Sequence, residues 1–132
     1  MDITIREREE RDLSGIAMVR IDTWRSAYRG IVPDAVLDGM SYAADEARFR
    51  QRYLETREEK NSYFLVAVDP AERVVGFAVG GQEREGFPGY PGELFALYVL
   101  PECQGQGIGQ RLAGEIFARL HAAELEPVII WA

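Results

Sequence analysis

The stretch that decides the fold is an apolar strand sequence running into a glycine-rich turn, Leu97-Tyr98-Val99-Leu100-Pro101-Glu102-Cys103-Gln104-Gly105-Gln106-Gly107-Ile108-Gly109-Gln110. Pro101 ends the strand, because proline has no amide hydrogen to donate to a continuing ladder. Glycines let a backbone turn its amides toward one point, and the start of a following helix adds unpaired donors and partial positive charge. The stretch therefore predicts an anion site between a strand and a helix.

Both flanks of this turn carry regular patterns. After it, Ile108, Leu112, Ile116 and Leu120 recur every four residues, which predicts an amphipathic helix. The chain closes on the apolar run 127–131, Pro-Val-Ile-Ile-Trp, which is typical of a strand buried in a parallel sheet. A strand, a helix and a second strand in this order predict a parallel crossover connection.

The N-terminal part predicts antiparallel strands and two helices. Residues 62–68 and 74–81 are apolar, β-prone runs around the polar turn 69–73, which indicates a hairpin. Residues 85–92 hold three glycines and two prolines and are read as a loop. A short strand is expected at Ile3 and Ile5. A first helix is expected after its N-cap Asp12, ended by Gly30 and Pro33. A second helix is expected from its N-cap Ser41 to about Lys60.

Together these patterns predict a mixed α/β fold in one domain, residues 1–132. Its sheet is expected to have antiparallel N-terminal strands and a parallel strand-helix-strand unit at the C-terminal end, with helices on its flanks. A chain of 132 residues buries enough surface for a core without disulfides or zinc. The order of the strands does not follow from the pattern.

Composition excludes several classes of function. One cysteine and one histidine, Cys103 and His121, cannot form a disulfide framework or a structural zinc cluster, so no metal site is expected. A net charge of −7 with a single lysine, Lys60, argues against nucleic-acid binding. No apolar run approaches the length of a membrane span, and the charged N-terminus is unlike a signal peptide. We therefore expect a cytoplasmic protein with, at most, a weak preference for cationic substrates.

Three known anion-binding templates can be compared with the turn. A P-loop needs Gly-Lys-Ser/Thr, but Gln110 and Arg111 follow Gly109. A dinucleotide fingerprint needs glycine or alanine at position 110, where glutamine stands. The spacing that fits is Gln-x-x-Gly-x-Gly, supplied by Gln104, Gly107 and Gly109 after a strand that ends in Leu-Tyr-Val.

This spacing resembles the acyl-CoA-binding motif of the GNAT superfamily of N-acetyltransferases. The segment with Trp24 and residues 27–33, Ala-Tyr-Arg-Gly-Ile-Val-Pro, is similar to the first helix of small bacterial members. The resemblance implies acetyl-CoA as cosubstrate, with its pyrophosphate on the backbone amides of Gln104, Gly105, Gln106, Gly107, Ile108 and Gly109. It also implies that the backbone of the strand segment Leu97, Tyr98 and Val99 pairs with the pantetheine arm.

Acetyl transfer to an amine needs a base, because amines with pKa values of about 8 to 10.4 are mostly protonated at neutral pH. The resemblance implies that Glu93, at the start of the strand, is this general base, with Glu83 and Glu85 in reserve. A distorted strand with an unpaired amide stabilises an oxyanion, and the resemblance assigns this to the backbone from Leu97 to Val99. Trp24 and Tyr28 are expected either in the core or on the wall of the acceptor site.

Many family members protonate the departing thiolate with a tyrosine beyond the fifth strand, and continue with a helix and two more strands. The sequence stops at Ala132, so we expect a longer chain or a second copy to cover the last strand, and Tyr98 is the substitute acid. The resemblance implies direct transfer from acetyl-CoA to a primary amine of a small molecule or peptide. The alternative is a catalytically degenerate acyl-CoA-binding sensor or interaction domain.

Overall fold

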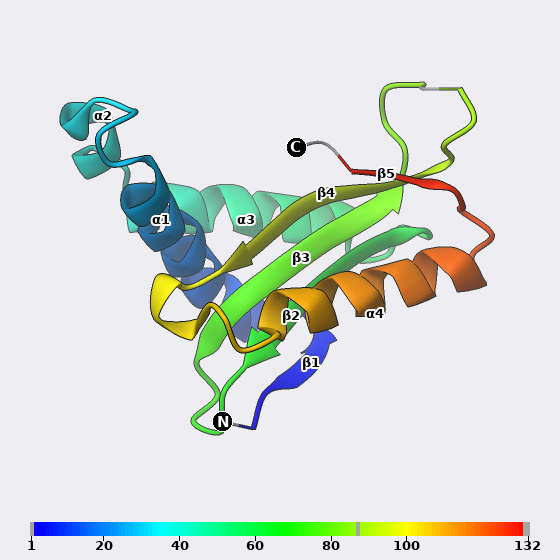
Figure 1. Ribbon diagram of the computed structural model, residues 1–132, viewed down its shortest axis with the longest axis horizontal. Helices are drawn as coiled ribbons and strands as arrows, with labels where there is room; N and C mark the ends of the chain where they lie inside the picture. Colours follow the sequence, from blue (N-terminus) through cyan, green and yellow to red (C-terminus); the bar gives the residue numbers. More distant parts are fainter. Residues whose placement is uncertain (1, 87, 131–132) are drawn as a thin grey trace.

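The computed structural model describes residues 2–86 and 88–130 and contains one mixed sheet (Figure 1). Its strands are β1 (Thr4–Glu7), β2 (Ser62–Val68), β3 (Val74–Gln82), β4 (Gly92–Val99) and β5 (Val128–Ile130). They lie in chain order across the sheet. The first four are antiparallel, whereas β5 is parallel to β4. The predicted mixed α/β fold is therefore confirmed, including the parallel unit at the C-terminal end.

Helices cover both faces of this sheet (Figure 1). On one face α4 (Ile108–Ala122) buries the predicted row of four apolar residues against β3. On the other face lie α1 (Leu13–Tyr28) and α3 (Tyr42–Thr56), and Phe49 of α3 contacts Phe77 of β3. The short helices are α2 (Asp34–Asp38) and the 3-10 turns Glu10–Asp12 and Pro101–Cys103. Within the described residues, no helix is long and apolar enough to cross a membrane.

Three local expectations need correction. The Asp12 side chain does not cap α1, because it accepts hydrogen bonds from the Glu9 amide and from Arg6 instead. The helix that begins after its N-cap Ser41 ends at Thr56 and not near Lys60. Residues 57–60 are all charged, so this segment has no apolar side chain that would pack against the core and stabilise a further helical turn. The five-residue helix α2 was not expected, because it is too short to show a periodicity.

The hairpin between β2 and β3 follows its predicted chemistry. The Asp69 carboxylate accepts hydrogen bonds from the amides of Ala71 and Arg73, both at 2.9 Å. This is the Asx-turn geometry that favours aspartate at the start of a turn. The strands pair from Ser62 opposite Gly81 to Val68 opposite Val74. Their register places the side chain of Phe77 on the α3 face.

A β-bulge distorts β4 in its middle. Val79 pairs with Ala96 and Gly80 with Leu94, so Phe95 is the additional residue. Gly80 allows close packing at this point, since a Cβ atom there would lie 2.6 Å from Ile116 and 3.0 Å from the Glu93 carbonyl. The expected distortion therefore exists, but it lies at Phe95, whereas the strand is regular from Leu97 to Val99.

The edge of β4 is only partly covered by β5. The two strands pair over three positions, from Gly92 opposite Val128 to Leu94 opposite Ile130. From Phe95 onward that edge of β4 has no strand partner among residues 2–86 and 88–130. Leu97, in this stretch, is 39% exposed. Trp131 of the predicted last strand lies outside the described residues.

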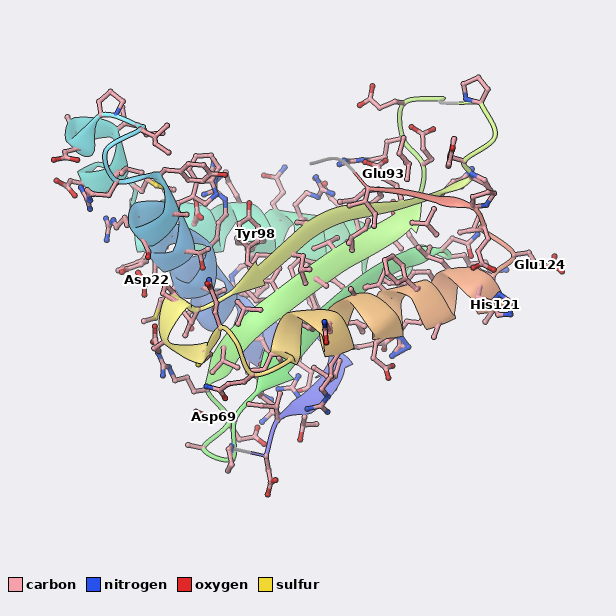
Figure 2. All side chains as sticks on the ribbon, viewed as in Figure 1. Asp22, Asp69, Glu93, Tyr98, His121 and Glu124 are labelled. Atoms are coloured by element: carbon pink, nitrogen blue, oxygen red, sulfur yellow. The ribbon has the colours of Figure 1, made fainter. Side chains whose placement is uncertain are left out.

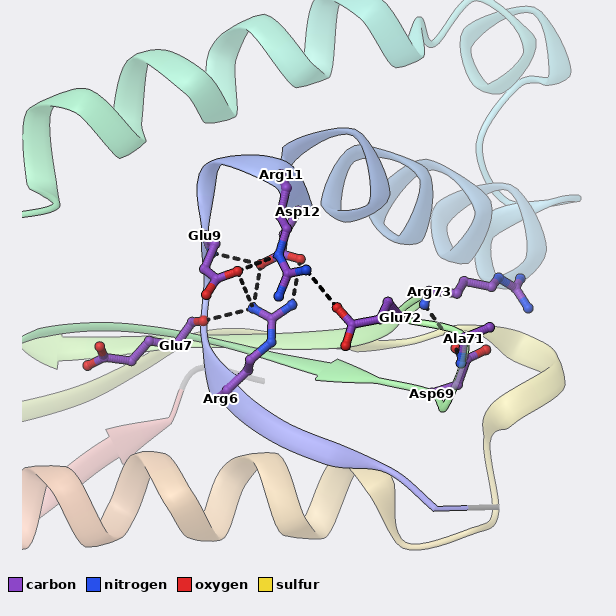
Figure 3. Close-up of polar contacts among 9 residues, drawn as sticks. All are labelled: Arg6, Glu7, Glu9, Arg11, Asp12, Asp69, Ala71, Glu72 and Arg73. Carbon is purple, nitrogen blue, oxygen red and sulfur yellow. Dashed lines mark hydrogen bonds and ion pairs between the residues drawn. The ribbon is translucent and has the colours of Figure 1, made fainter.

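An ion pair joins the start of the chain to the rest (Figure 3). Arg6 on β1 donates two hydrogen bonds to Asp12, at 2.7 and 2.9 Å, and the carboxylate is buried. Arg11, beside it, pairs with Glu72 of the β2–β3 turn at 2.8 Å. Burial opposes ionisation of Asp12, but the Arg6 guanidinium and the Glu9 amide outweigh it and hold the pKa of this carboxyl below its usual value.

The first prediction concerns this carboxylate. Asp12→Asn should lower the free energy of unfolding at pH 7 by about 1.5–3 kcal/mol, because a charge-assisted hydrogen-bond pair is lost. A carboxyl with a lowered folded-state pKa stabilises above its unfolded value of about 3.9 and loses this effect as the pH falls further. Urea unfolding of both proteins should show the difference at pH 7 and its disappearance in acid. Equal stability at pH 7 would contradict the role of the pair.

Candidate functional site

The glycine-rich turn forms the N-terminal end of α4. Gly105 and Gly107 have φ values of +79° and +80°, a left-handed conformation that only glycine adopts without strain. Gly107 is the residue before the helix, and the first helical bond here is from the Arg111 amide to the Gly107 carbonyl at 3.1 Å. The amides of the three residues before Arg111 therefore have no helical acceptor. They form a local concentration of donors with partial positive charge.

A hollow of about 430 Å³ lies at this turn. We call it the turn pocket, and its lining is Val99, Cys103, Gln104, Gly105, Gly107, Ile108, Gly109 and Gln110. A Cβ atom at Gly105 or Gly107 would meet nothing within 4 Å, so the glycines leave the backbone open on this side. The structure thus brings the end of β4 and most of the predicted turn residues together, with Gln106 in the same turn.

One side chain of the turn is held by a hydrogen bond and another is buried. The Gln104 amide donates to the Val99 carbonyl at 3.0 Å, which ties the turn to the end of β4. Cys103 is buried, and burial raises the pKa of its thiol. A thiol of this kind is a weak nucleophile. The capacity to bind an anion therefore comes from the backbone of the turn and not from its side chains.

Glu93 lies at the start of β4, but its side chain is not exposed to solvent. Its side chain is fully buried, and its carboxylate accepts hydrogen bonds from the Arg84 amide at 3.2 Å and from the Arg84 guanidinium at 2.9 Å. The guanidinium also lies 3.9 Å above the Phe95 ring. Sequence reasoning missed Arg84, although an acid inside an apolar strand requires a nearby cation.

Trp24, Tyr28 and Tyr98 form an aromatic cluster between α1 and β4. The Trp24 indole donates to the Tyr98 hydroxyl at 3.2 Å, and the ring centres of Trp24 and Tyr28 are 4.7 Å apart. Trp24 is partly exposed and does not belong to the buried core. Because the Tyr98 oxygen accepts the indole hydrogen, its own hydrogen remains available for another acceptor.

The two candidate catalytic side chains, Glu93 and Tyr98, lie toward opposite ends of β4 (Figure 2). Five residues along a strand correspond to about 16 Å. The two side chains are therefore anchored at well-separated positions on the strand. The bulge at Phe95 lies between them. His121 lies near the C-terminal end of α4, where it pairs with Glu126.

Among the described residues, no group of three His, Cys, Asp or Glu side chains is arranged to hold a metal ion.

Relatives with solved structures have the same fold. The PaiA N-acetyltransferase from Thermoplasma acidophilum, in complex with coenzyme A, superposes with a TM-score of 0.83 at 20% identity over 100% of this chain and 80% of that one. A GNAT family acetyltransferase from Brucella melitensis, in complex with acetyl-CoA, gives a TM-score of 0.67 at 20% identity over 99% of this chain and 76% of that one. At these identities the similarity concerns the fold.

Sequence comparison gives the family. An uncharacterized N-acetyltransferase of Bacillus subtilis, YuaI, is 37% identical over 110 residues, which are 83% of this chain and 60% of that protein. An L-methionine sulfoximine/L-methionine sulfone acetyltransferase of Pseudomonas aeruginosa is 28% identical over 98% of this chain and 70% of its own length. The family model of the acetyltransferase (GNAT) family matches residues 16–132. The chain therefore belongs to the GNAT acetyltransferase family.

Proposed function

We propose that the protein transfers an acetyl group from acetyl-CoA to a primary amine of a small molecule or peptide. The observation that carries this proposal is the turn pocket, where the left-handed glycines and the free amides of α4 face a hollow beside the open edge of β4. The names of the relatives support acetyl transfer, and coenzyme A or acetyl-CoA in the structural neighbours supports the donor.

The donor fits the groups that the chain presents. A pyrophosphate needs several amide donors with open space beside them. The start of α4 supplies amides without helical acceptors, and Gly105 and Gly107 leave open space beside the turn. The pantetheine arm contains amides, and the backbone of Leu97 and Val99, which has no strand partner on this edge among the described residues, would hold it as a strand would. Bound in this way, the thioester points along β4 toward Phe95. Acetyl-CoA supplies the activated acyl group, and the chain orients it.

Proton transfer then takes place around the middle of β4. In our proposal Glu93 takes the proton of the attacking amine, through water, because the carboxylate is buried behind Arg84. Tyr98 gives a proton to the departing thiolate, and the Trp24 indole fixes its hydroxyl for this purpose. Trp24 and Tyr28 would form the wall of the site at this end. The backbone amide at the Phe95 bulge is the proposed donor to the oxyanion.

The second prediction tests the turn pocket by calorimetric titration with acetyl-CoA. Gly107→Val should weaken binding by roughly tenfold or more, because a β-branched residue is strained at φ +80° and projects into the hollow. Gly114→Ala is the matched control, since this glycine lies within α4 with open space at its Cβ position. The control should bind normally and gain up to about 1 kcal/mol of stability. Equal affinities of both variants and the wild type would refute the site.

The third prediction separates the two proposed proton-transfer residues. Glu93→Gln should lower kcat by about 100-fold or more and remove the acid limb of the pH–rate profile, with acetyl-CoA affinity unchanged. Tyr98→Phe should lower kcat about 10- to 100-fold and leave the acid limb in place. A purely structural Glu93 would give lower stability in urea with both limbs intact. Binding of acetyl-CoA without turnover of any amine would favour the sensor alternative.

The fourth prediction concerns assembly. Among residues 2–86 and 88–130, β5 lies at the edge of the sheet, and Ile130 on it is 55% exposed. We propose that a second copy of the chain covers this edge, because exposed apolar edge strands readily pair with other chains. Sedimentation equilibrium should then give the mass of a dimer, and Ile130→Lys should shift the population toward monomer. A wild-type protein that stays monomeric at high micromolar concentration would exclude the dimer.

A further inference from the structure

A second hollow, of about 240 Å³, lies on the α3 face of the sheet at the bulge of β4. Phe95 and Ala96 of β4 line it, and Ala96 lies about 10 Å along the strand from Val99 in the turn pocket. Its volume is below the roughly 300–1,000 Å³ of a drug-sized site, so it suits a small molecule. Its wall combines three phenylalanines with three arginines, Phe49, Phe64, Phe95, Arg8, Arg52 and Arg84. We call it the arginine pocket.

Arg8 is a cation without an acidic partner. Its guanidinium donates to the Thr56 hydroxyl at 2.7 Å and lies 4.3 Å above the Phe64 ring. Among the described residues, no carboxylate lies within ion-pair distance of it. Burial, followed by the charge of Arg52, lowers the pKa of Arg8 to about 10. A positive charge held under these conditions is stabilised by an anion in the hollow.

The neighbouring arginines do not neutralise this charge. Arg52 lies exposed on α3 and forms no ion pair in the part of the chain that the structure describes. Arg84 pairs with Glu93, so its charge is already compensated. No aspartate or glutamate is among the residues that line the pocket in the described part of the chain. Two uncompensated guanidinium groups therefore face a hollow with aromatic walls.

We infer that the arginine pocket binds a carboxylate of the acceptor, and that the acceptor is an amino acid with an apolar side chain. This inference rests on the proposed function, because it assigns the acceptor of the same transfer. Guanidinium groups bind carboxylates through paired hydrogen bonds, and the three phenylalanine rings offer apolar surface to the side chain. With both groups seated, the α-amino group lies next to β4 at Phe95 and Ala96.

The reaction balances without a further reactant. The amine nitrogen forms a bond to the acetyl carbon, and the carbon–sulfur bond breaks with its electron pair on sulfur. The proton lost by nitrogen leaves through Glu93, and the thiolate takes up one proton, so the products are the N-acetylamino acid and free coenzyme A.

The local charge is opposite to that of the whole molecule. A net charge of −7 gives a weak general preference for cations. Salt screens such long-range effects beyond about 8 Å under physiological conditions. A group bound in the hollow interacts mainly with Arg8 and Arg52, which lie against it. The expected preference for cationic acceptors is therefore reversed within this pocket.

The fifth prediction uses matched acceptors, phenylalanine and 2-phenylethylamine, which differ by the carboxylate. The wild type should acetylate phenylalanine with a kcat/KM about 10- to 100-fold higher than its kcat/KM for 2-phenylethylamine. Release of free thiol measures both reactions. Arg52→Met should lower kcat/KM for phenylalanine about tenfold and leave 2-phenylethylamine within about twofold. Arg57→Met is the matched control. Arg57 is the C-cap residue of α3, the helix that carries Arg52, but it does not line the arginine pocket. It should change neither value.

A binding measurement keeps this inference separate from the proposed transfer. N-acetylphenylalanine should bind to the wild type and about tenfold more weakly to Arg52→Met, as followed by NMR titration. If 2-phenylethylamine or spermidine is acetylated as well as phenylalanine, the carboxylate inference is wrong while the transfer stands. If no amine is acetylated, binding of N-acetylphenylalanine through Arg52 still supports the pocket. Absence of that binding overturns it.

Discussion

The close contact between α4 and β3 is the constraint on which the rest of the structure depends. Gly76 and Gly80 of β3 have no side chains, and a Cβ atom at these positions would lie 3.3 Å from Leu112 and 2.6 Å from Ile116 of α4. The apolar row of α4 therefore packs directly onto the strand backbone. This contact fixes the direction of α4, and with it the position of the helix start beside the end of β4. The glycine-rich turn has its geometry because the helix is held there.

The same contact explains the arrangement of the two pockets. α4 occupies one face of the sheet, so the other face is left to α1 and α3. β4 contributes to both pockets, with Val99 in one and Phe95 and Ala96 in the other. Its edge is open between these positions, because β5 pairs only with residues 92–94 in the described part of the chain. A thioester along this edge would reach an amine that enters from the α3 face.

Sequence patterns predicted the regular parts of this fold because each depends on neighbours in the chain. The row of α4, the Asp69 turn and the two strands around it are local patterns, and all are confirmed. Features that depend on distant residues were not predictable. The Arg8–Thr56 hydrogen bond spans 48 residues, and the pairing of Glu93 with Arg84 depends on how the loop after β3 folds back. The roles of Glu93 and Tyr98 stay predictions, although their positions on β4 are now defined.

The two pockets also differ in whether backbone groups or side chains form them. The turn pocket is built from backbone amides and requires little beyond glycine at two positions. The arginine pocket is built from side chains on separate elements, so single substitutions can reshape it without disturbing the turn. With the roles proposed for the two pockets, descendants of such a chain can change acceptor while they keep the same acyl donor. Low sequence identity among proteins of this fold is compatible with a shared donor and widely different acceptors.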